Sequence, residues 1–185
     1  TARRGSTHGY DVVDPTTINP ALGGEPGFRA LVGALRAQGL GVVLDIVLNH
    51  VAVGGDDNAW WLDVLEKGQA SPFARFFDID WNPAEPGLAG KVLAPFLGAP
   101  YGEALAAGAL ALDVEQDTGR LSVLAHEAHR FPLRREDYEE VLAAAGAARL
   151  EELDRERLAR AYDPARLHAL LQRQHYRLAW WRTAG

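Results

Sequence analysis

The chain contains no cysteine and no methionine among its 185 residues. Without thiols it can form neither disulfides nor thiolate metal sites. This composition agrees with a reducing compartment, so we expect a cytoplasmic protein. Even an initiator methionine is absent, so we expect a segment of a longer protein.

Long apolar runs and an excess of positive charge are also missing. The most hydrophobic stretch, residues 41–50, is interrupted by Asp45, Asn49 and His50, far short of the roughly 20 apolar residues of a membrane-spanning helix. The net charge is −6 with scattered signs, whereas a nucleic-acid partner requires a basic track. We therefore predict a globular protein with no membrane partner and no nucleic-acid partner.

What is present near the N-terminus predicts an α/β fold. Residues 25–39 carry apolar side chains at helical spacing and end at Gly39, which is typical of a helix and its C-terminal glycine. Residues 41–47 form a nearly continuous apolar run that is rich in β-branched side chains, as in a parallel strand that is covered on both faces. A helix, a glycine and a buried strand make half of a βαβ unit.

The remainder reads as mostly helical with one small hairpin. Alternating strands at 110–126 flank the turn residues Asp117 to Gly119. The final periodic segment opens with Asp163 as N-cap and Pro164 in the first turn. The expected helices are 58–68, 71–77, 135–146, 148–162 and 163–185.

Three polar side chains follow the predicted strand. Asp45, Asn49 and His50 lie toward its carboxyl end, where parallel sheets bind ligands. Alternatively, the aspartate braces neighbouring loops and the Asn-His pair caps a turn. From this stretch alone we favour the bracing interpretation.

A second motif changes that balance. THGYDVVDP at 7–15, a helix, and DIVLNH at 45–50 together resemble the α-amylase family of glycoside hydrolases. The resemblance implies a partial (β/α)8 TIM barrel around its third strand. It further implies part of the barrel in 1–50, a mostly helical inserted domain with the hairpin in 51–160, and the barrel helix before strand four in 161–185.

Further segments resemble one branch of this family in particular. The segments 5–28, 49–81, 91–105 and 129–133 resemble the maltooligosyltrehalose synthase branch. This branch implies an isomerase of trehalose biosynthesis that converts the reducing-end α-1,4 bond of a maltodextrin into an α,α-1,1 bond, without a cofactor. The alternatives are another amylase-type hydrolase or transglucosidase, and an inactive α-glucan-binding segment.

The resemblance assigns substrate-binding roles residue by residue. Tyr10 would stack on the glucose at the cleavage subsite, and His50 would hydrogen-bond the hydroxyl on C6 of that sugar. Asp45 would be a buried brace beneath the site. His8 and Asp11 could line the same wall, although loop bracing explains them equally well. Asn49 matches a calcium-binding position of some amylases, but no acidic cluster surrounds it, so we predict no metal.

No catalytic residue is expected within this chain. The family uses an aspartate nucleophile, a glutamate acid and a supporting aspartate, and the resemblance puts them beyond residue 185. The rest of the parent chain is therefore an expected partner, and this chain alone should be inactive. Asp78 and Asp80 are better explained as turn residues than as a carboxylate pair.

Other candidates are weaker. His168 and His175 are too far apart on one expected helix to share a metal ion. Trp180 and Trp181 are expected in a buried helical stripe. Whether the pair at 60–61 contacts sugar is open.

Overall fold

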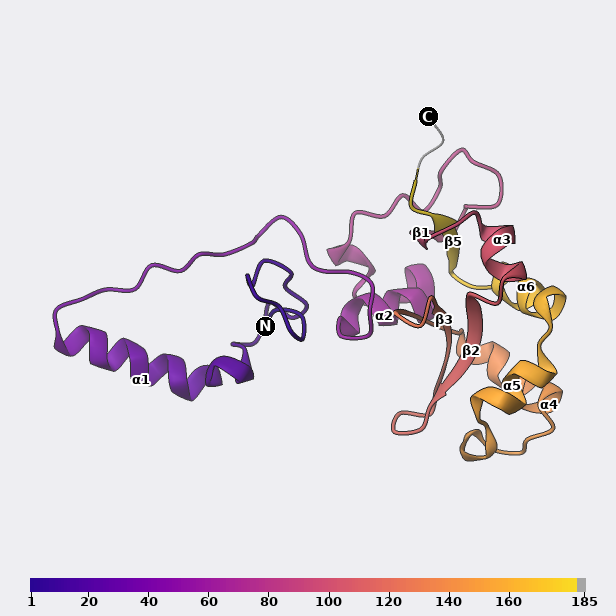
Figure 1. Ribbon diagram of the computed structural model, residues 1–185. Coiled ribbons are helices and arrows are strands. Elements are labelled where there is room, and N and C mark those ends of the chain that lie inside the picture. The colour runs from indigo at the N-terminus through magenta and orange to yellow at the C-terminus, as the bar shows by residue number, and fades with distance from the viewer. Residues whose placement is uncertain (183–185) are drawn as a thin grey trace. The chain divides into compact units, whose positions relative to one another are not determined.

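The computed structural model describes residues 1–182, and it divides the chain into two compact units. We call Thr1–Ala59 the N-terminal unit and Trp60–Gly185 the C-terminal unit. Helices and strands together make up an α/β fold (Figure 1). Among the described residues, no helix is long and apolar enough to cross a membrane.

The chain contains helices, strands and single 3-10 turns with the following bounds. The helices longer than one turn are α1 (Gly24–Ala37), α2 (Ala59–Lys67), α3 (Tyr101–Ala106), α4 (Tyr138–Ala144), α5 (Arg155–Ala161) and α6 (Pro164–Gln172). The strands are β1 (Val92–Leu97), β2 (Leu110–Glu115), β3 (Arg120–Ala125), β4 (His129–Pro132) and β5 (Tyr176–Trp180). Single 3-10 turns occur at Pro20–Leu22, Gly68–Ala70, Ala74–Phe76, Arg135–Asp137 and Leu150–Glu152.

The N-terminal unit consists of a looped segment, α1 and an extended tract. α1 forms as predicted and stops before Gly39, whose φ of 69° is the left-handed conformation that glycine adopts without strain. The helix buries none of its residues within the chain. Buried side chains in this unit are few, among them Val13 and Asn58.

The strand predicted at 41–47 does not form among the described residues. These residues have no sheet partner and run as an extended tract after α1 (Figure 1). Val43 is 98% exposed. A strand requires neighbouring strands to accept and donate its backbone hydrogen bonds, and none pairs with this segment among the described residues.

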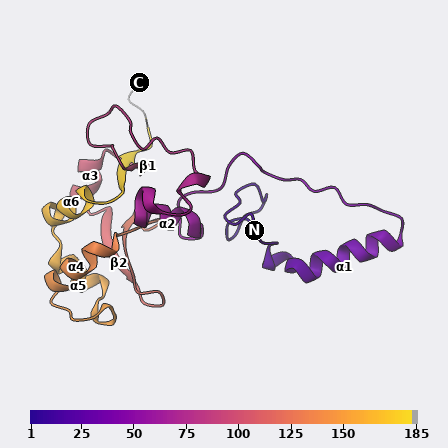
Figure 2. The same ribbon diagram turned by 180° about the vertical axis from the view of Figure 1, so that it is seen from behind.

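The C-terminal unit contains two sheets and a common core. β2, β3 and β4 form an antiparallel meander, which confirms the predicted hairpin, and β1 pairs with β5 in parallel. Figures 1 and 2 show α2 on one side of the β2–β3 hairpin and α4, α5 and α6 on the other. Among the fully buried side chains are Leu65, Leu121, Phe131, Leu158 and Tyr176.

The predicted helix over 163–185 is correct only in its first half. α6 begins as expected, with the Asp163 carboxylate accepting a 2.8 Å hydrogen bond from Arg166 N, and it ends at Gln172. Residues 176–180 form β5, because Tyr176 and Leu178 alternate as buried side chains and β1 lies alongside as a partner. Residues 183–185 lie outside the described part of the chain.

Two smaller expectations also need correction. Trp180 and Trp181 are 36% and 59% exposed, so they form no buried stripe. The helix expected over 148–162 is divided, because Leu153 is extended and Asp154 caps a new helix by accepting a 2.7 Å hydrogen bond from Arg157 N.

Candidate substrate-binding site

The backbone of the N-terminal unit brings its two motifs together. Ala2 and Val12 form an isolated antiparallel bridge, and Val13 N donates to Thr1 O at 3.0 Å. On the other side, Ala52 N donates to Val12 O at 2.7 Å. Tyr10 and His50 each lie two residues before this last pair, so the segments that carry them run next to each other.

Tyr10 and Asp45 meet directly. The Tyr10 hydroxyl donates a 2.7 Å hydrogen bond to Asp45 Oδ2, and the tyrosine is 49% exposed. This hydrogen bond and the carboxylate charge raise the pKa of Tyr10, because both favour the neutral phenol. The ring is therefore held by its hydroxyl at one end while much of its surface stays accessible.

Asp45 is exposed, which corrects the expectation of a buried brace. The reason is that the tract on either side of it is not covered by a sheet. Its carboxylate accepts a hydrogen bond from the Tyr10 hydroxyl and is not buried beneath the site.

His8 lies beside Tyr10. Their rings stack with centroids 5.9 Å apart and planes 18° apart, and Nδ1 of His8 accepts a 3.0 Å hydrogen bond from Tyr10 N. Because Nδ1 accepts, a neutral His8 carries its proton on Nε2, which can donate to a ligand. One face of the Tyr10 ring is occupied by this contact.

Asp11 has a bracing role within the loop. Ser6 Oγ donates to Asp11 Oδ1, and this hydrogen bond lowers the pKa of Asp11. The same Oγ accepts from Gly9 N at 3.0 Å. Ser6 was missed in the sequence analysis; the only local signal for it is that serine is frequent in turns, where its hydroxyl can bond nearby backbone groups.

An open hollow of about 350 Å³ lies where these residues meet. An aromatic ring, an imidazole and a carboxylate can stack on and hydrogen-bond a polar, ring-shaped ligand such as a sugar. Its lining residues are Thr1, His8, Gly9, Tyr10, Val12, Pro15, Asp45, Ile46, Val47 and Leu48. Asn49 and His50 follow directly in the chain and are exposed, but they are not among the residues that line it.

The described carboxylates of this unit have local partners rather than a catalytic arrangement. Asp14 accepts from Thr16 N at 2.8 Å and from Thr17 Oγ1 at 2.9 Å, as in an Asx turn. Asp80, in the other unit, accepts from Asn82 N at 2.9 Å, which supports the turn interpretation of that acidic segment. Within residues 1–182, no group of three or more His, Cys, Asp or Glu side chains could hold a metal ion.

The remaining candidates of the C-terminal unit have structural partners. His168 Nδ1 lies 3.0 Å from Tyr101 Oη, and burial lowers the pKa of His175. Trp61 is 7% exposed and belongs to the core. Trp60 stacks on Phe73, with centroids 5.3 Å apart and planes 8° apart.

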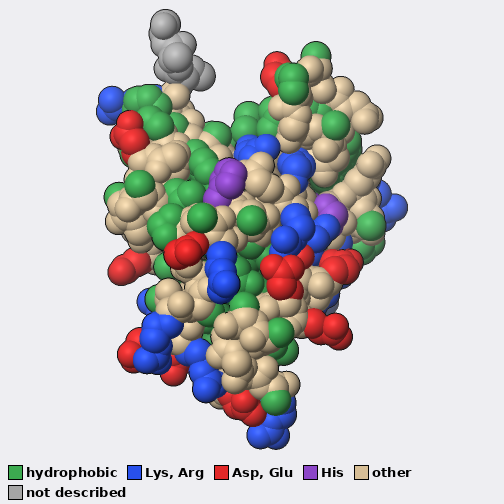
Figure 3. Space-filling model, turned by 90° about the vertical axis from the view of Figure 1, so that its right-hand side faces the viewer, with side chains coloured by type: hydrophobic (Ala, Val, Ile, Leu, Met, Phe, Trp, Pro, Cys, Tyr) green, Lys and Arg blue, Asp and Glu red, His purple; other side chains and the backbone are tan. Residues whose placement is uncertain are grey.

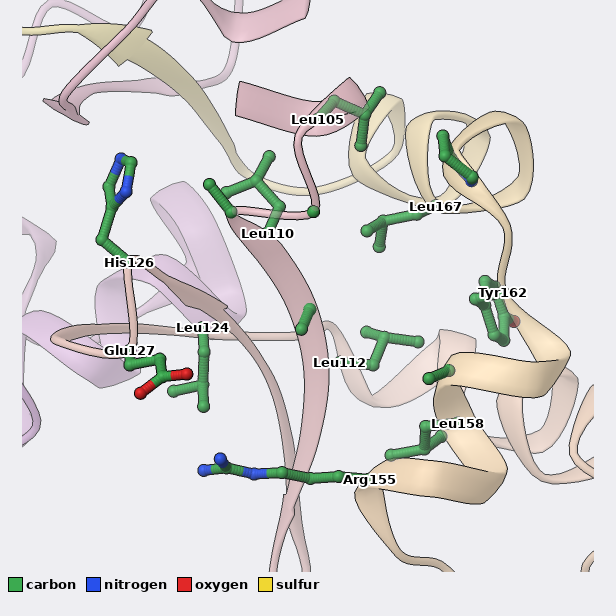
Figure 4. Close-up of a pocket in the computed structure, with 15 residues that line it drawn as sticks. Leu105, Leu110, Leu112, Leu124, His126, Glu127, Arg155, Leu158, Tyr162 and Leu167 are labelled. Carbon is green, nitrogen blue, oxygen red and sulfur yellow. The ribbon is translucent and has the colours of Figure 1, made fainter. Parts of the chain in front are cut away.

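A larger hollow of about 690 Å³ lies inside the C-terminal unit between β2, α5 and α6. Figure 4 shows leucines such as Leu112, Leu158 and Leu167 lining it. Arg155, at its edge, is engaged by Asp113 at 2.6 Å. Its lining is mainly aliphatic, with His126, Glu127, Arg155 and Tyr162 as its polar members. Polar side chains therefore make up a smaller share of its lining than of the hollow at Tyr10, which we take as the better candidate for a sugar site.

The surface of this unit carries both signs of charge. On the face in Figure 3, acidic and basic side chains lie next to one another. Ion pairs of the C-terminal unit include Arg173 with Glu140 at 2.7 Å and Arg130 with Asp113 at 2.8 Å.

Comparison with known proteins relates the chain to enzymes of α-glucan chemistry. Residues 2–101 match the alpha-amylase family, described as "Alpha amylase, catalytic domain". The chain is 46% identical over 128 residues to the "Putative maltooligosyl trehalose synthase" of Mycobacterium tuberculosis, a match that covers 64% of this chain and 16% of that protein.

Two solved structures match almost the whole chain. The "DSM5389 glycosyltrehalose synthase" has a TM-score of 0.75 and 29% identity, with 100% of this chain and 22% of that one covered. The maltooligosyltrehalose synthase from Arthrobacter ramosus has a TM-score of 0.64 and 34% identity, with 98% and 19% covered. The chain thus spans about a fifth of the length of these structures. With a family match over more than half of its residues, the chain belongs to the alpha-amylase family.

Proposed function

We propose that this chain is part of a maltooligosyltrehalose synthase, an intramolecular transglucosidase of trehalose biosynthesis. The observation that carries the proposal is the hollow in which Tyr10, His8 and Asp45 converge, in a chain that resembles such synthases over 98–100% of its length. Its substrate would be a maltooligosaccharide, and the parent enzyme would act in the cytoplasm.

We propose that residues 1–50 belong to the (β/α)8 catalytic barrel, with 41–47 as its third strand. The exposed apolar side chains of this tract support this placement, since a barrel strand is covered on both faces once its neighbours are present. Residues 51–160 would form the inserted domain. Residues 161–185 would lead toward strand four, with α6 followed by β5 in place of one long helix.

The side chains of the hollow would hold the glucose at the cleavage subsite. Tyr10 offers the ring face that His8 leaves free, and its hydroxyl is fixed by Asp45. Stacking would orient the sugar at low entropic cost. His50 would donate to the hydroxyl on C6, with Asn49 beside it, and Asp11 would stabilise the loop.

The catalytic carboxylates would come from the rest of the parent chain. In the proposed reaction an aspartate displaces the reducing-end glucose and forms a glycosyl ester while a glutamate protonates the leaving O4. The retained glucose then turns, and its anomeric hydroxyl attacks the ester as the glutamate takes back the proton. One α-1,4 bond is lost and one α,α-1,1 bond forms, with no net water consumed.

Product analysis on the full-length protein tests this proposal. With maltopentaose as substrate, we expect reducing ends to disappear while the chain length stays at five glucose units. Growth of reducing ends together with free glucose would identify a hydrolase instead.

A hydrolase is the second candidate because related hydrolases also match the motif region. The chain is 39% identical over 75 residues to Neopullulanase 2 of Thermoactinomyces vulgaris, which covers 40% of this chain and 12% of that protein. This match is shorter than those to the synthases, so we favour the synthase.

A further inference from the structure

We propose that Arg3 is a positioning residue of this site. Its side chain clamps the loop that follows His50, while its backbone holds the loop that carries His8 and Tyr10. The inference rests on the proposed function. It adds to the proposed site a residue that lies outside both motifs.

The guanidinium of Arg3 contacts three groups of the loop at 53–57. Nη2 donates to Val53 O at 3.1 Å and to Gly54 O at 2.7 Å. Nε lies 3.4 Å from Asp57 Oδ1. The Asp57 side chain is only 13% exposed, so this contact is shielded from solvent more than an ordinary surface ion pair.

The backbone of Arg3 belongs to the other loop. Arg3 N donates to Asp11 O at 2.9 Å, and Arg3 O accepts from Ser6 N at 3.0 Å. Arg4 N adds a 3.1 Å hydrogen bond to Asp57 Oδ2. One short segment therefore ties the loop that carries His8 and Tyr10 to the loop at 53–57, which follows His50.

The shape of the 53–57 loop explains why arginine suits this position. Gly54 and Gly55 adopt left-handed φ values of 84° and 70°, and the carbonyls of Val53 and Gly54 both reach the same guanidinium nitrogen. A planar fork can serve two carbonyls and a carboxylate at once. A lysine ammonium could donate to the two carbonyls from one nitrogen, but it has no second nitrogen to reach the Asp57 carboxylate at the same time.

The clamp acts close to the proposed binding residues. Only two residues separate His50 from Val53, and Ala52 N bonds Val12 O at 2.7 Å between the two loops. The Asn58 amide also donates to Ala52 O at 2.7 Å. Without the Arg3 side chain the segment after His50 keeps the Ala52–Val12 backbone bond to the Tyr10 loop but loses the guanidinium contacts that fix residues 53–57. Small displacements of substrate-positioning groups lower catalytic rates strongly.

The test uses the full-length enzyme and maltopentaose turnover. We expect Arg3→Ala to lower kcat/KM roughly 10- to 100-fold, with Arg3→Lys recovering only a minor part. Arg4→Ala is the matched control, because its side chain is 82% exposed and reaches Asp56 only at 3.9 Å. It should stay within about twofold of wild type.

A double-mutant cycle separates positioning from general destabilisation. If Arg3 acts through His50, Arg3→Ala should have much less effect in a His50→Ala background than in wild type. An equal effect in both backgrounds, a loss no larger than that of Arg4→Ala, or full rescue by Arg3→Lys would overturn the inference. A wild-type protein that only hydrolyses maltopentaose would refute the proposed function instead, and the same cycle could then be measured on hydrolysis rates.

Discussion

The Tyr10 hydroxyl donates a 2.7 Å hydrogen bond to the carboxylate of Asp45, which lies 35 residues further along the chain. This contact joins the two motifs by which the family is recognised. It also fixes the aromatic ring that we propose as a sugar platform.

The two functions of Tyr10 can be separated by substitution in the parent enzyme. Tyr10→Phe keeps the ring but removes the donor to Asp45, so we expect kcat/KM for maltopentaose to fall roughly three- to tenfold. Tyr10→Ala also removes the stacking face. It should raise KM because stacking binds ground state and transition state alike, and it should lower kcat because the sugar is no longer held in its reactive orientation. Equal losses in the two variants would mean that the ring itself contributes nothing.

His50→Ala should behave differently. Its hydrogen bond to the sugar is expected to strengthen as the ring flattens toward an oxocarbenium ion. We therefore expect a loss of about 2–4 kcal/mol of transition-state stabilisation, seen mainly in kcat. Steady-state kinetics with maltopentaose measure it. A change confined to KM would show that His50 is not at the cleavage subsite.

The C-terminal unit should fold without the N-terminal one. Leu158 and Phe131 are 0% and 1% exposed within it, whereas α1 buries no residue. A polypeptide of residues 60–185 should therefore show near-ultraviolet dichroism and a cooperative thermal transition, and one of residues 1–59 should show neither. The complete chain should self-associate through its exposed tract at 40–48 and should have no activity on maltodextrins.

A core substitution provides the control for that experiment. Leu158→Ala should lower the free energy of unfolding of the 60–185 polypeptide by about 2–4 kcal/mol, because it removes buried apolar contacts with β2 and enlarges the hollow that Leu158 lines. Leu93 is 53% exposed, so Leu93→Ala should cost less than about 1 kcal/mol. Similar losses at the two positions would indicate a loosely packed core.

Acid stability of the C-terminal unit should depend on Asp137. Burial acts to raise the pKa of this carboxyl, but hydrogen bonds from Arg134 and Gln174 hold it below the ordinary value of 3.8. A depressed pKa in the folded state contributes stability that is complete above the unfolded value and is lost as pH falls below it. The free energy of unfolding should therefore decline below about pH 4.

Asp137→Asn tests this assignment. At neutral pH the variant should be less stable by about 1–3 kcal/mol, and the difference from wild type should shrink as pH falls through 4. Glu139 is exposed, so Glu139→Gln is the control and should change little. A constant difference across the acid range would show that Asp137 is not the titrating group.

The sequence by itself determined the family, the first helix and the hairpin. The HGYD and DIVLNH motifs identify the family without tertiary information, and α1 follows from local periodicity and from the conformational freedom of Gly39. The hairpin at 110–125 follows from alternation around a turn. Each of these features depends on residues that are close together in the chain.

Tertiary structure decided what depends on distant partners. Residues 176–180 become a strand because β1, more than 80 residues earlier, supplies their hydrogen bonds. The apolar residues 41–47 remain unpaired because no described strand forms backbone hydrogen bonds with them. The hydrogen bonds from Tyr10 to Asp45 and from Arg3 to Val53 and Gly54 likewise join separate segments. Such contacts depend on how the backbone brings the segments together, which no local pattern specifies.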